Sequence, residues 1–129
     1  MSSIILDTHA IIWYFLDSKK LSEVARDTID AADRIYISSI SVVEIIYLNE
    51  KSKISNVAIE RLNQALTKLD AQWFVASLDL PTAQSIADIK REVVPEMPDR
   101  IVAATAAYLG LPLVTRDSKI QNSTIQTIW

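Results

Sequence analysis

The chain alternates between short apolar runs and longer segments in which apolar residues recur every three or four positions. Short runs rich in β-branched and aromatic residues are typical of strands, and the longer periodic segments are typical of amphipathic helices. The predicted strands are residues 3–6, 34–38, 73–78 and 113–115, with residues 124–128 as a candidate fifth. The predicted helices are residues 9–16, 21–32, 56–68, 81–92 and 99–109, and a further helix begins at residues 41–48.

The segment 99–109 consists of good helix formers, and its four alanines let a helix lie close to a sheet. Gly110 and then Pro112 predict where this helix stops. Strands that alternate with helices predict a parallel sheet covered on both faces, with right-handed crossovers. The predicted fold class is therefore α/β, a three-layer α/β/α sandwich with a central, mainly parallel sheet of four to five strands.

Composition excludes several classes of protein. The 129 residues fit a single domain over residues 1–129, and half of them are hydrophobic, so a core can form. Because Gly110 is the only glycine, a glycine-rich phosphate or dinucleotide loop is excluded. The lack of cysteine excludes disulfides and thiolate sites and suits the cytoplasm. No apolar run approaches the ~20 residues that cross a membrane, and the N-terminus has no signal-peptide pattern.

Four acidic residues lie in apolar surroundings at the ends of predicted elements. Asp7 directly follows the first strand and Asp117 follows the fourth, while Glu44 and Asp99 lie near the starts of helices. In parallel α/β sheets these positions share one edge, where ligands gather. Carboxylates that meet there repel one another unless they take up protons or share a cation, and oxygen ligands favour Mg²⁺ or Mn²⁺. Such an ion would also explain how a chain of net charge −3 handles a phosphodiester.

Each acid also has a purely structural interpretation. Asp7 suits a helix N-cap, Asp99 favours the dipole of its helix, and Asp117 suits a turn. Ser41 and Glu44 have the spacing of a capping box, in which Glu44 would only cap its helix. For each residue taken singly both interpretations stay open. The position of all four at one predicted edge favours the ligand set.

Four blocks of this sequence resemble PIN-domain proteins, specifically the VapC-type toxins of toxin–antitoxin pairs. The blocks are IILDTHAIIWYFLD, LSEVAR, YISSISVVEII and PDRIVAATAAYLGLPLVTRDS, in the family's order over nearly the whole chain. The resemblance implies a compact α/β/α sandwich and an endoribonuclease that depends on Mg²⁺ or Mn²⁺. It also implies an RNA substrate, a homodimer, and inhibition by a small antitoxin whose tail enters the active site.

The resemblance assigns roles to individual residues. The family's metal-site acids correspond to Asp7, Glu44, Asp99 and Asp117, and Thr115 matches a position whose hydroxyl supports the site. The sequence departs from the family at two places. Ile120 stands where many members have phenylalanine, and residues 93–98 replace a longer stretch that contains histidine or proline. These departures leave the metal site intact and put the choice of RNA in doubt.

Basic residues near the acids are candidates for substrate binding. Arg100 and Arg116 each adjoin a site acid, so they could contact phosphate or form ion pairs that orient the acids. Lys119 is a weaker candidate of the same kind. Lys51 and Lys53 are interpreted as solubilising residues beyond the helix that carries Glu44.

The remaining chemistry is interpreted as structural. His9, the single histidine, is predicted to support the site rather than act as a base, because metal-activated water needs none. Residues 13–15, all aromatic, are predicted in the core or at a dimer surface ahead of an RNA-stacking role. Two alternatives to the nuclease remain: a catalytically silent PIN-like interaction scaffold, and an aspartyl phosphatase of the haloacid dehalogenase type. The second would use Asp7 as nucleophile and lacks the expected second aspartate, because that position is His9.

Overall fold

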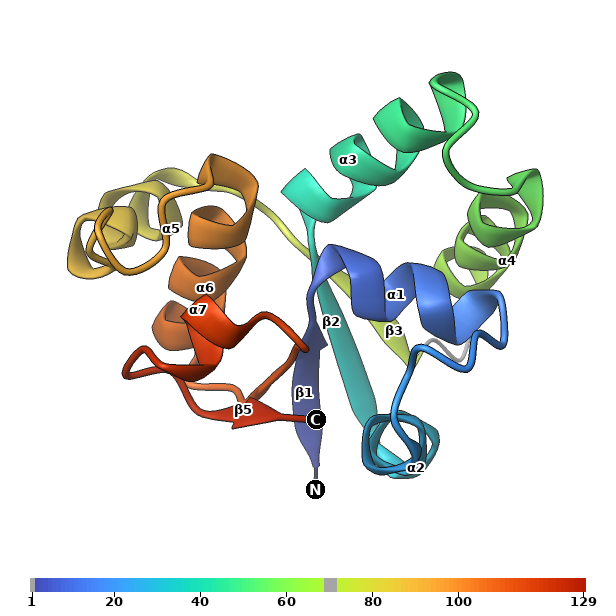
Figure 1. Cartoon of the computed structure of the whole chain (residues 1–129), viewed down its shortest axis with the longest axis horizontal. Coiled ribbons are helices and arrows are strands. Elements are labelled where there is room, and N and C mark those ends of the chain that lie inside the picture. Colours follow the sequence, from blue (N-terminus) through green and yellow to red (C-terminus); the bar gives the residue numbers. More distant parts are fainter. Residues whose placement is uncertain (1, 69–71) are drawn as a thin grey trace.

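A single five-stranded sheet forms the centre of the computed structural model, which describes residues 2–68 and 72–129 (Figure 1). All strand pairs are parallel, and the strand order is β3-β2-β1-β4-β5. The strands are β1 Ser3–Leu6, β2 Arg34–Ser38, β3 Trp73–Ala76, β4 Leu113–Val114 and β5 Thr127–Ile128. The predicted α/β class is confirmed, including the candidate fifth strand, here limited to two residues.

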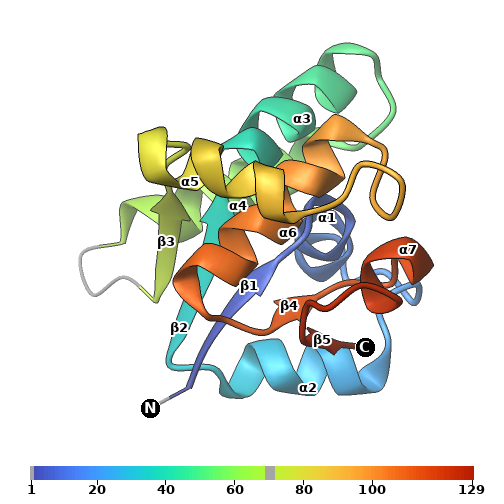
Figure 2. The ribbon, with the colours of Figure 1, turned by 90° about the vertical axis from the view of Figure 1, so that its left-hand side faces the viewer.

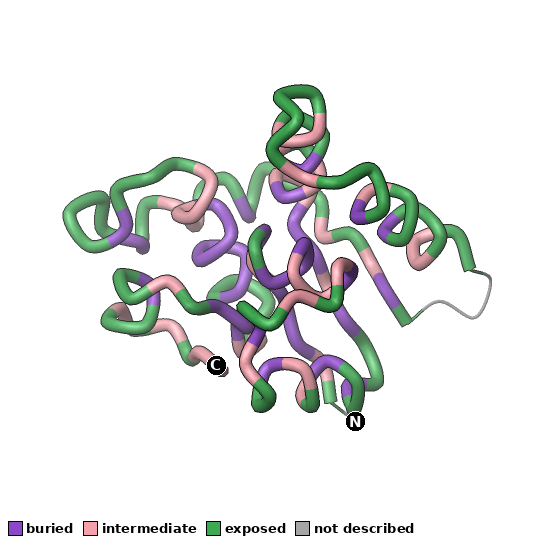
Figure 3. The backbone as a smooth tube through the Cα atoms, turned by 45° about the vertical axis from the view of Figure 1, so that its right-hand side comes forward, coloured by how far each residue is buried: buried purple, intermediate pink, exposed green. Residues whose placement is uncertain are grey.

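Helices cover both faces of the sheet, which accounts for its apolar strands. The helices are α1 Thr8–Phe15, α2 Glu23–Ala31, α3 Ser39–Glu50, α4 Asn56–Thr67, α5 Leu80–Ser85, α6 Met97–Leu109 and α7 Ser118–Gln121, with a 3₁₀ turn η1 at Ile86–Asp88. Side chains of β1 alternate between the faces: Ile4 and Leu6 pack with the side of α1, α2 and α4, and Ile5 packs with α6. Both faces are therefore buried, as Figure 3 shows by the buried segments at the centre of the molecule.

The carboxyl ends of the strands point toward α3, and α2 lies at the opposite end of the sheet (Figure 2). β1 leads directly into α1 and β2 into α3, so both helices begin at the same edge. β4 ends at this edge as well, because β1 pairs with it in parallel, Leu6 opposite Val114. The topology thus brings together the residues that follow β1, β2 and β4.

The helix predicted over residues 81–92 is shorter than expected. α5 ends at Ser85, η1 adds three residues, and Ile89 is already extended. Arg100 explains the break: its guanidinium donates to the carbonyls of Ile86, at 3.2 Å, and Ile89, at 2.7 Å. The Ile86 carbonyl also accepts the N–H of Ile89 at the end of the 3₁₀ turn, while the Ile89 carbonyl is bound by a side chain of α6 instead of continuing a helix.

Other boundaries differ by a few residues. α3 begins at Ser39, where Ser38 caps it by accepting from the N–H of Ile40, and α6 begins at Met97 with a proline in its first turn. β3 ends at Ala76, two residues before the predicted end. The predicted end of the last long helix is confirmed: Gly110 adopts φ of 68°, the left-handed conformation suited to a C-terminal glycine. None of the described helices is long and apolar enough to span a bilayer.

Candidate active site

Asp7 is fixed at the junction of β1 and α1 by bonds to both carboxylate oxygens. Its Oδ1 accepts from the N–H of Ala10 at 2.8 Å and so caps α1, while its Oδ2 accepts the hydroxyl of Thr115. The structural interpretation of Asp7 as an N-cap is thus correct. The same bonds aim the half-buried carboxylate at the sheet edge, so capping and a functional role are compatible.

Thr115 connects two of the acids. It directly follows β4, its side chain has no solvent exposure, and its Oγ1 also accepts the N–H of Asp117 at 3.0 Å. One hydroxyl therefore holds Asp7, near the start of the chain, beside Asp117, near its end. This position suits the supporting role that the family resemblance implies.

Asp117 and Asp99 form the second part of the acid group. Asp117 caps α7, because its Oδ1 accepts from the N–H groups of Lys119 at 2.8 Å and Ile120 at 3.2 Å. Asp99 lies in the first turn of α6, where burial and then the nearby charge of Asp117 raise its pKa. Neighbouring carboxyls favour a shared proton or a bound cation.

Glu44 lies on α3 and reaches the site through Thr8. Its Oε1 is 2.6 Å from Thr8 Oγ1, which is also 2.9 Å from Ser41 Oγ. The capping-box interpretation is wrong, because α3 is already capped by Ser38 and Ser41 lies inside the helix. Glu44 is instead tied to the residue that follows Asp7.

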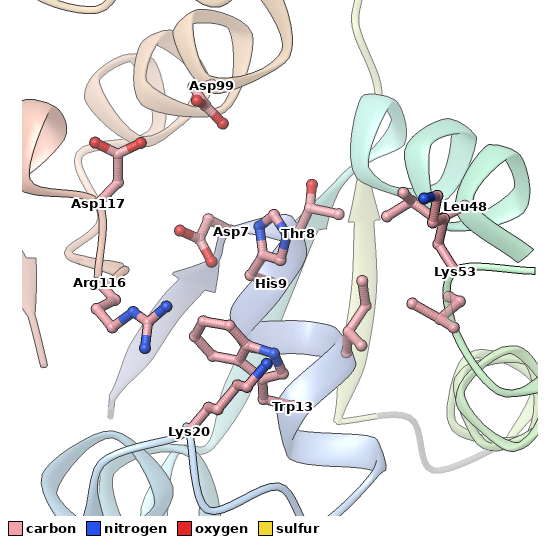
Figure 4. Close-up of a pocket in the computed structure, with 12 residues that line it drawn as sticks. Asp7, Thr8, His9, Trp13, Lys20, Leu48, Lys53, Asp99, Arg116 and Asp117 are labelled. Carbon is pink, nitrogen blue, oxygen red and sulfur yellow. The ribbon is translucent and has the colours of Figure 1, made fainter. Parts of the chain in front are cut away.

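The three aspartates line one wall of a cleft of about 520 Å³ (Figure 4). His9 and Trp13 of α1 line it beside them, together with Arg116. Lys20 and Lys53 also line the cleft, from loops that follow α1 and α3. The cleft therefore has an acidic region and an aromatic and basic region side by side.

The electrostatics of the acidic region are unbalanced. Burial raises the pKa of Asp7, an effect that the hydrogen bonds from Thr115 and Ala10 partly offset. Burial and then the charges of Asp117, Glu44 and Asp7 raise the pKa of Asp99 to about 6. Over residues 2–68 and 72–129 the one ion pair joins Arg26 to Asp17, so no arginine or lysine neutralises these acids.

The carboxylate oxygens of the site suit a hard divalent cation, although the acids are too far apart to surround one in this arrangement. In the described part of the chain, no three histidine, aspartate or glutamate side chains lie close enough together to hold a metal ion as they stand. The available donors are carboxylate oxygens, and burial together with the charges of neighbouring acids raises the pKa of Asp7 and Asp99. Such oxygens suit Mg²⁺ or Mn²⁺ better than Zn²⁺.

The three basic candidates have different surroundings. Arg116 lines the cleft, with its guanidinium 4.5 Å from the centre of the Trp13 ring and, among the described residues, without a carboxylate partner. Arg100 is directed at the carbonyls of Ile86 and Ile89 and does not line the cleft. Lys119 is exposed and contributes its main-chain N–H to Asp117.

Sequence reasoning missed Trp13, Lys20 and Lys53 as cleft residues. The position of Trp13 in the cleft could have been predicted from its spacing. His9 and Trp13 are four positions apart and so lie on one face of a helix that begins at the sheet edge. Lys20 and Lys53 lie in loops, where no periodic pattern indicates direction. The interpretation of Lys53 as only a solubilising residue is incomplete, because it lines the cleft.

The raised pKa of Asp99 predicts how stability depends on pH without metal. A carboxyl whose pKa is higher in the folded chain binds protons more tightly there, so the free energy of unfolding falls as pH rises from about 4 to about 6. Asp99→Asn removes this charge, so the variant should match the wild type near pH 4 and exceed it at pH 7. Thermal unfolding in EDTA measures the difference. Asp27→Asn, which removes an exposed carboxylate of α2, is the control, and a pH-independent difference for Asp99→Asn would contradict the prediction.

Comparisons with known proteins agree with this architecture. A family model described as the PIN domain matches residues 4–124. Ribonuclease VapC22 of Mycobacterium tuberculosis is 27% identical over 122 residues, which cover 95% of this chain and 92% of that protein. VapBC2 of Rickettsia felis, solved with a DNA fragment from its promoter, has a TM-score of 0.74 at 17% identity and 97% and 96% coverage of the two chains. A toxin–antitoxin complex from Klebsiella pneumoniae has a TM-score of 0.71 at 20% identity, with 98% and 96% coverage.

Proposed function

Because the chain belongs to the PIN domain family, we propose that residues 1–129 form a single PIN-like domain that acts as a metal-dependent endoribonuclease. The observation that carries the proposal is the group of three aspartates, far apart along the chain, that line one cleft and, among the described residues, form no ion pair with an arginine or lysine. A relative named as a ribonuclease, similar over nearly the full length, supports RNA as the substrate.

Asp7, Asp99 and Asp117 are the residues that would hold Mg²⁺ or Mn²⁺, with Glu44 contributing directly or through water. When bound, such an ion supplies activation of water and neutralisation of the charge on the attacked phosphate. The chain's own part is to fix the donors. Thr115 orients Asp7, and the caps of α1 and α7 hold Asp7 and Asp117 in place.

The test is cleavage of single-stranded RNA by the purified chain in Mn²⁺ or Mg²⁺, with and without EDTA. We expect internal cuts, including linearisation of a circular RNA, which disappear when the metal is chelated. Absence of chelator-sensitive nicking would favour the interaction scaffold. A phosphorylated Asp7 would favour the phosphatase, which the sequence gives little reason to prefer because His9 stands where that family has its second aspartate.

We propose further that the chain is the toxin of a type II toxin–antitoxin pair, that it forms homodimers, and that it works in the cytoplasm. The structural likeness to a toxin–antitoxin complex supports a small protein antitoxin as partner. α3 supports protein contacts because it exposes the apolar side chains Val43, Ile46 and Tyr47 to solvent. Sedimentation of the purified chain at micromolar concentration should give the mass of a dimer, and a monomer mass would contradict the homodimer.

A further inference from the structure

Arg116 occupies an unusual position for a cation beside an acidic site. Its guanidinium lies over the Trp13 ring, 4.5 Å from the ring centre, and it immediately precedes Asp117 in the chain. Within residues 2–68 and 72–129 it forms no ion pair, although three aspartates line the same cleft. Its charge is therefore available to a ligand at the point where the proposed cleavage takes place.

Trp13 is held in place to serve as the platform for Arg116. The rings of Trp13 and Trp129 pack in a T-shaped arrangement with their centroids 5.9 Å apart, and the centroid of the His9 ring, one turn earlier on α1, lies 5.5 Å from that of Trp13. Trp13 is only half-buried and lines the cleft, so packing does not account for its whole surface. Two neighbouring rings restrict the movement of Trp13, and so also of the guanidinium that lies over it.

The geometry of a guanidinium allows two contacts at once. Its plane can stack on an aromatic ring or a nucleobase, while its N–H donors point outward within the plane toward a phosphate. In this chain the guanidinium carbon lies over the Trp13 ring, 4.5 Å from its centre, and the Arg116 side chain is exposed, so the guanidinium can place one face toward Trp13. The opposite face can therefore accept a base, which gives a stack of indole, guanidinium and base.

Size and charge of the cleft favour an unpaired nucleotide over a duplex. A volume of about 520 Å³ lies within the range of pockets that enclose one small ligand. Lys20 and Lys53 line the same cleft and extend its positive region away from the acids. A phosphate backbone would be drawn along these cations, and a base can leave its stack to enter the cleft only where the RNA is single-stranded.

We propose that Arg116 binds the nucleotide that flanks the cleaved phosphodiester, stacking on its base and donating to its phosphate, and that Trp13 is the positioning residue for this guanidinium. This inference rests on the proposed function and goes beyond it.

The test is the affinity of the full chain for a fluorescein-labelled, mixed-sequence single-stranded oligoribonucleotide in EDTA, measured by fluorescence anisotropy. Arg116→Ala and Trp13→Ala should each raise Kd by about tenfold, the scale expected for one stacked base. Because Trp13 acts through Arg116, the double variant should bind no more weakly than Arg116→Ala alone. The same RNA annealed to its complement should bind the wild type more weakly than the single strand.

Conservative variants separate stacking from charge. Arg116→Lys keeps the positive charge but lacks the planar guanidinium, so its Kd should approach that of Arg116→Ala. Trp13→Phe keeps an aromatic ring under Arg116, so it should retain most of the wild-type affinity. Arg34→Ala is the matched control, because Arg34 is an exposed arginine at the start of β2, the sheet end opposite the cleft. Its Kd should stay within about twofold of the wild type.

Wild-type affinity for Arg116→Lys, or for a folded Trp13→Ala, would overturn the inference while leaving the nuclease intact. If Trp13→Ala fails to fold, Arg116→Lys decides the question, because that side chain is exposed. If the wild type cleaves RNA with Mn²⁺ yet binds none in EDTA, the same comparisons are made on KM. A raised KM with unchanged kcat supports the subsite, and an unchanged KM overturns it. A wild type that neither binds nor cleaves RNA removes the inference and the proposed function together.

Discussion

Asp7→Asn is expected to lower the rate of RNA cleavage by on the order of a hundredfold or more while the chain stays folded. Asparagine keeps a carbonyl oxygen that can accept the N–H of Ala10, so the N-terminal cap of α1 is retained. The substitution removes the negative charge and one of the oxygens available to a cation. Initial rates in Mn²⁺, with circular dichroism and thermal unfolding of the same samples, measure both consequences.

Asp79→Asn is the matched control for this prediction. Asp79 caps α5 in the same way, with its Oδ1 accepting from the N–H of Thr82 at 3.0 Å, but it is exposed and does not line the cleft. If capping alone explained the importance of such aspartates, the two variants would lose similar activity. We expect Asp79→Asn to cleave RNA at the wild-type rate. Cleavage at the wild-type rate by Asp7→Asn would remove this residue from the mechanism.

The elements of the fold could be predicted where their signals are local. β1 and β2 are short apolar runs bounded by polar residues, and α6 ends at Gly110, a residue type that adopts positive φ without steric cost. The order of strands and helices then places Asp7 and Asp117 at the carboxyl edge of the sheet without any knowledge of side-chain contacts. This step explains why the acids could be proposed as a group.

The start of α3 shows where local signals fail. The segment SSIS offers Ser38, Ser39 and Ser41 as caps, and the spacing of Ser41 and Glu44 suits a capping box. The actual cap is Ser38, because β2 ends there in register with its neighbours, Ile37 opposite Leu6 and Ser38 opposite Ala76. Pairing between distant strands therefore decided which serine begins the helix.

Side-chain contacts across the chain could not be predicted at all. Arg100 and Arg116 each adjoin an aspartate in the sequence, yet one holds the carbonyls of Ile86 and Ile89 and the other lies over the Trp13 ring. The difference arises from what packs beside each arginine after folding. The same holds for Thr115, whose predicted support of the site rested on the family resemblance until the fold placed its hydroxyl beside Asp7.

Thr115→Val is expected to lower kcat/KM by roughly 10- to 100-fold and to lower the free energy of unfolding by about 1–3 kcal/mol. Valine resembles threonine in shape, so the packing around this fully buried position is largely kept. The lost hydroxyl leaves Asp7 Oδ2 and the N–H of Asp117 without their partner. Since the bond from Thr115 lowers the pKa of Asp7, its removal should also move the acidic limb of the pH–rate profile to higher pH.

Two variants separate this positioning role from loss of a buried hydroxyl in general. Thr115→Ser keeps the donor and should retain most of the activity and the original pH profile. Thr105→Val removes an equally buried hydroxyl that serves only its own helix, donating to the carbonyl of Ile101 at 2.7 Å. It should lose stability without a shift of the pH–rate profile. If Thr105→Val and Thr115→Val lose activity equally, or if neither profile moves, the bond between Thr115 and Asp7 does not control the acids, and their arrangement depends on the helix caps alone.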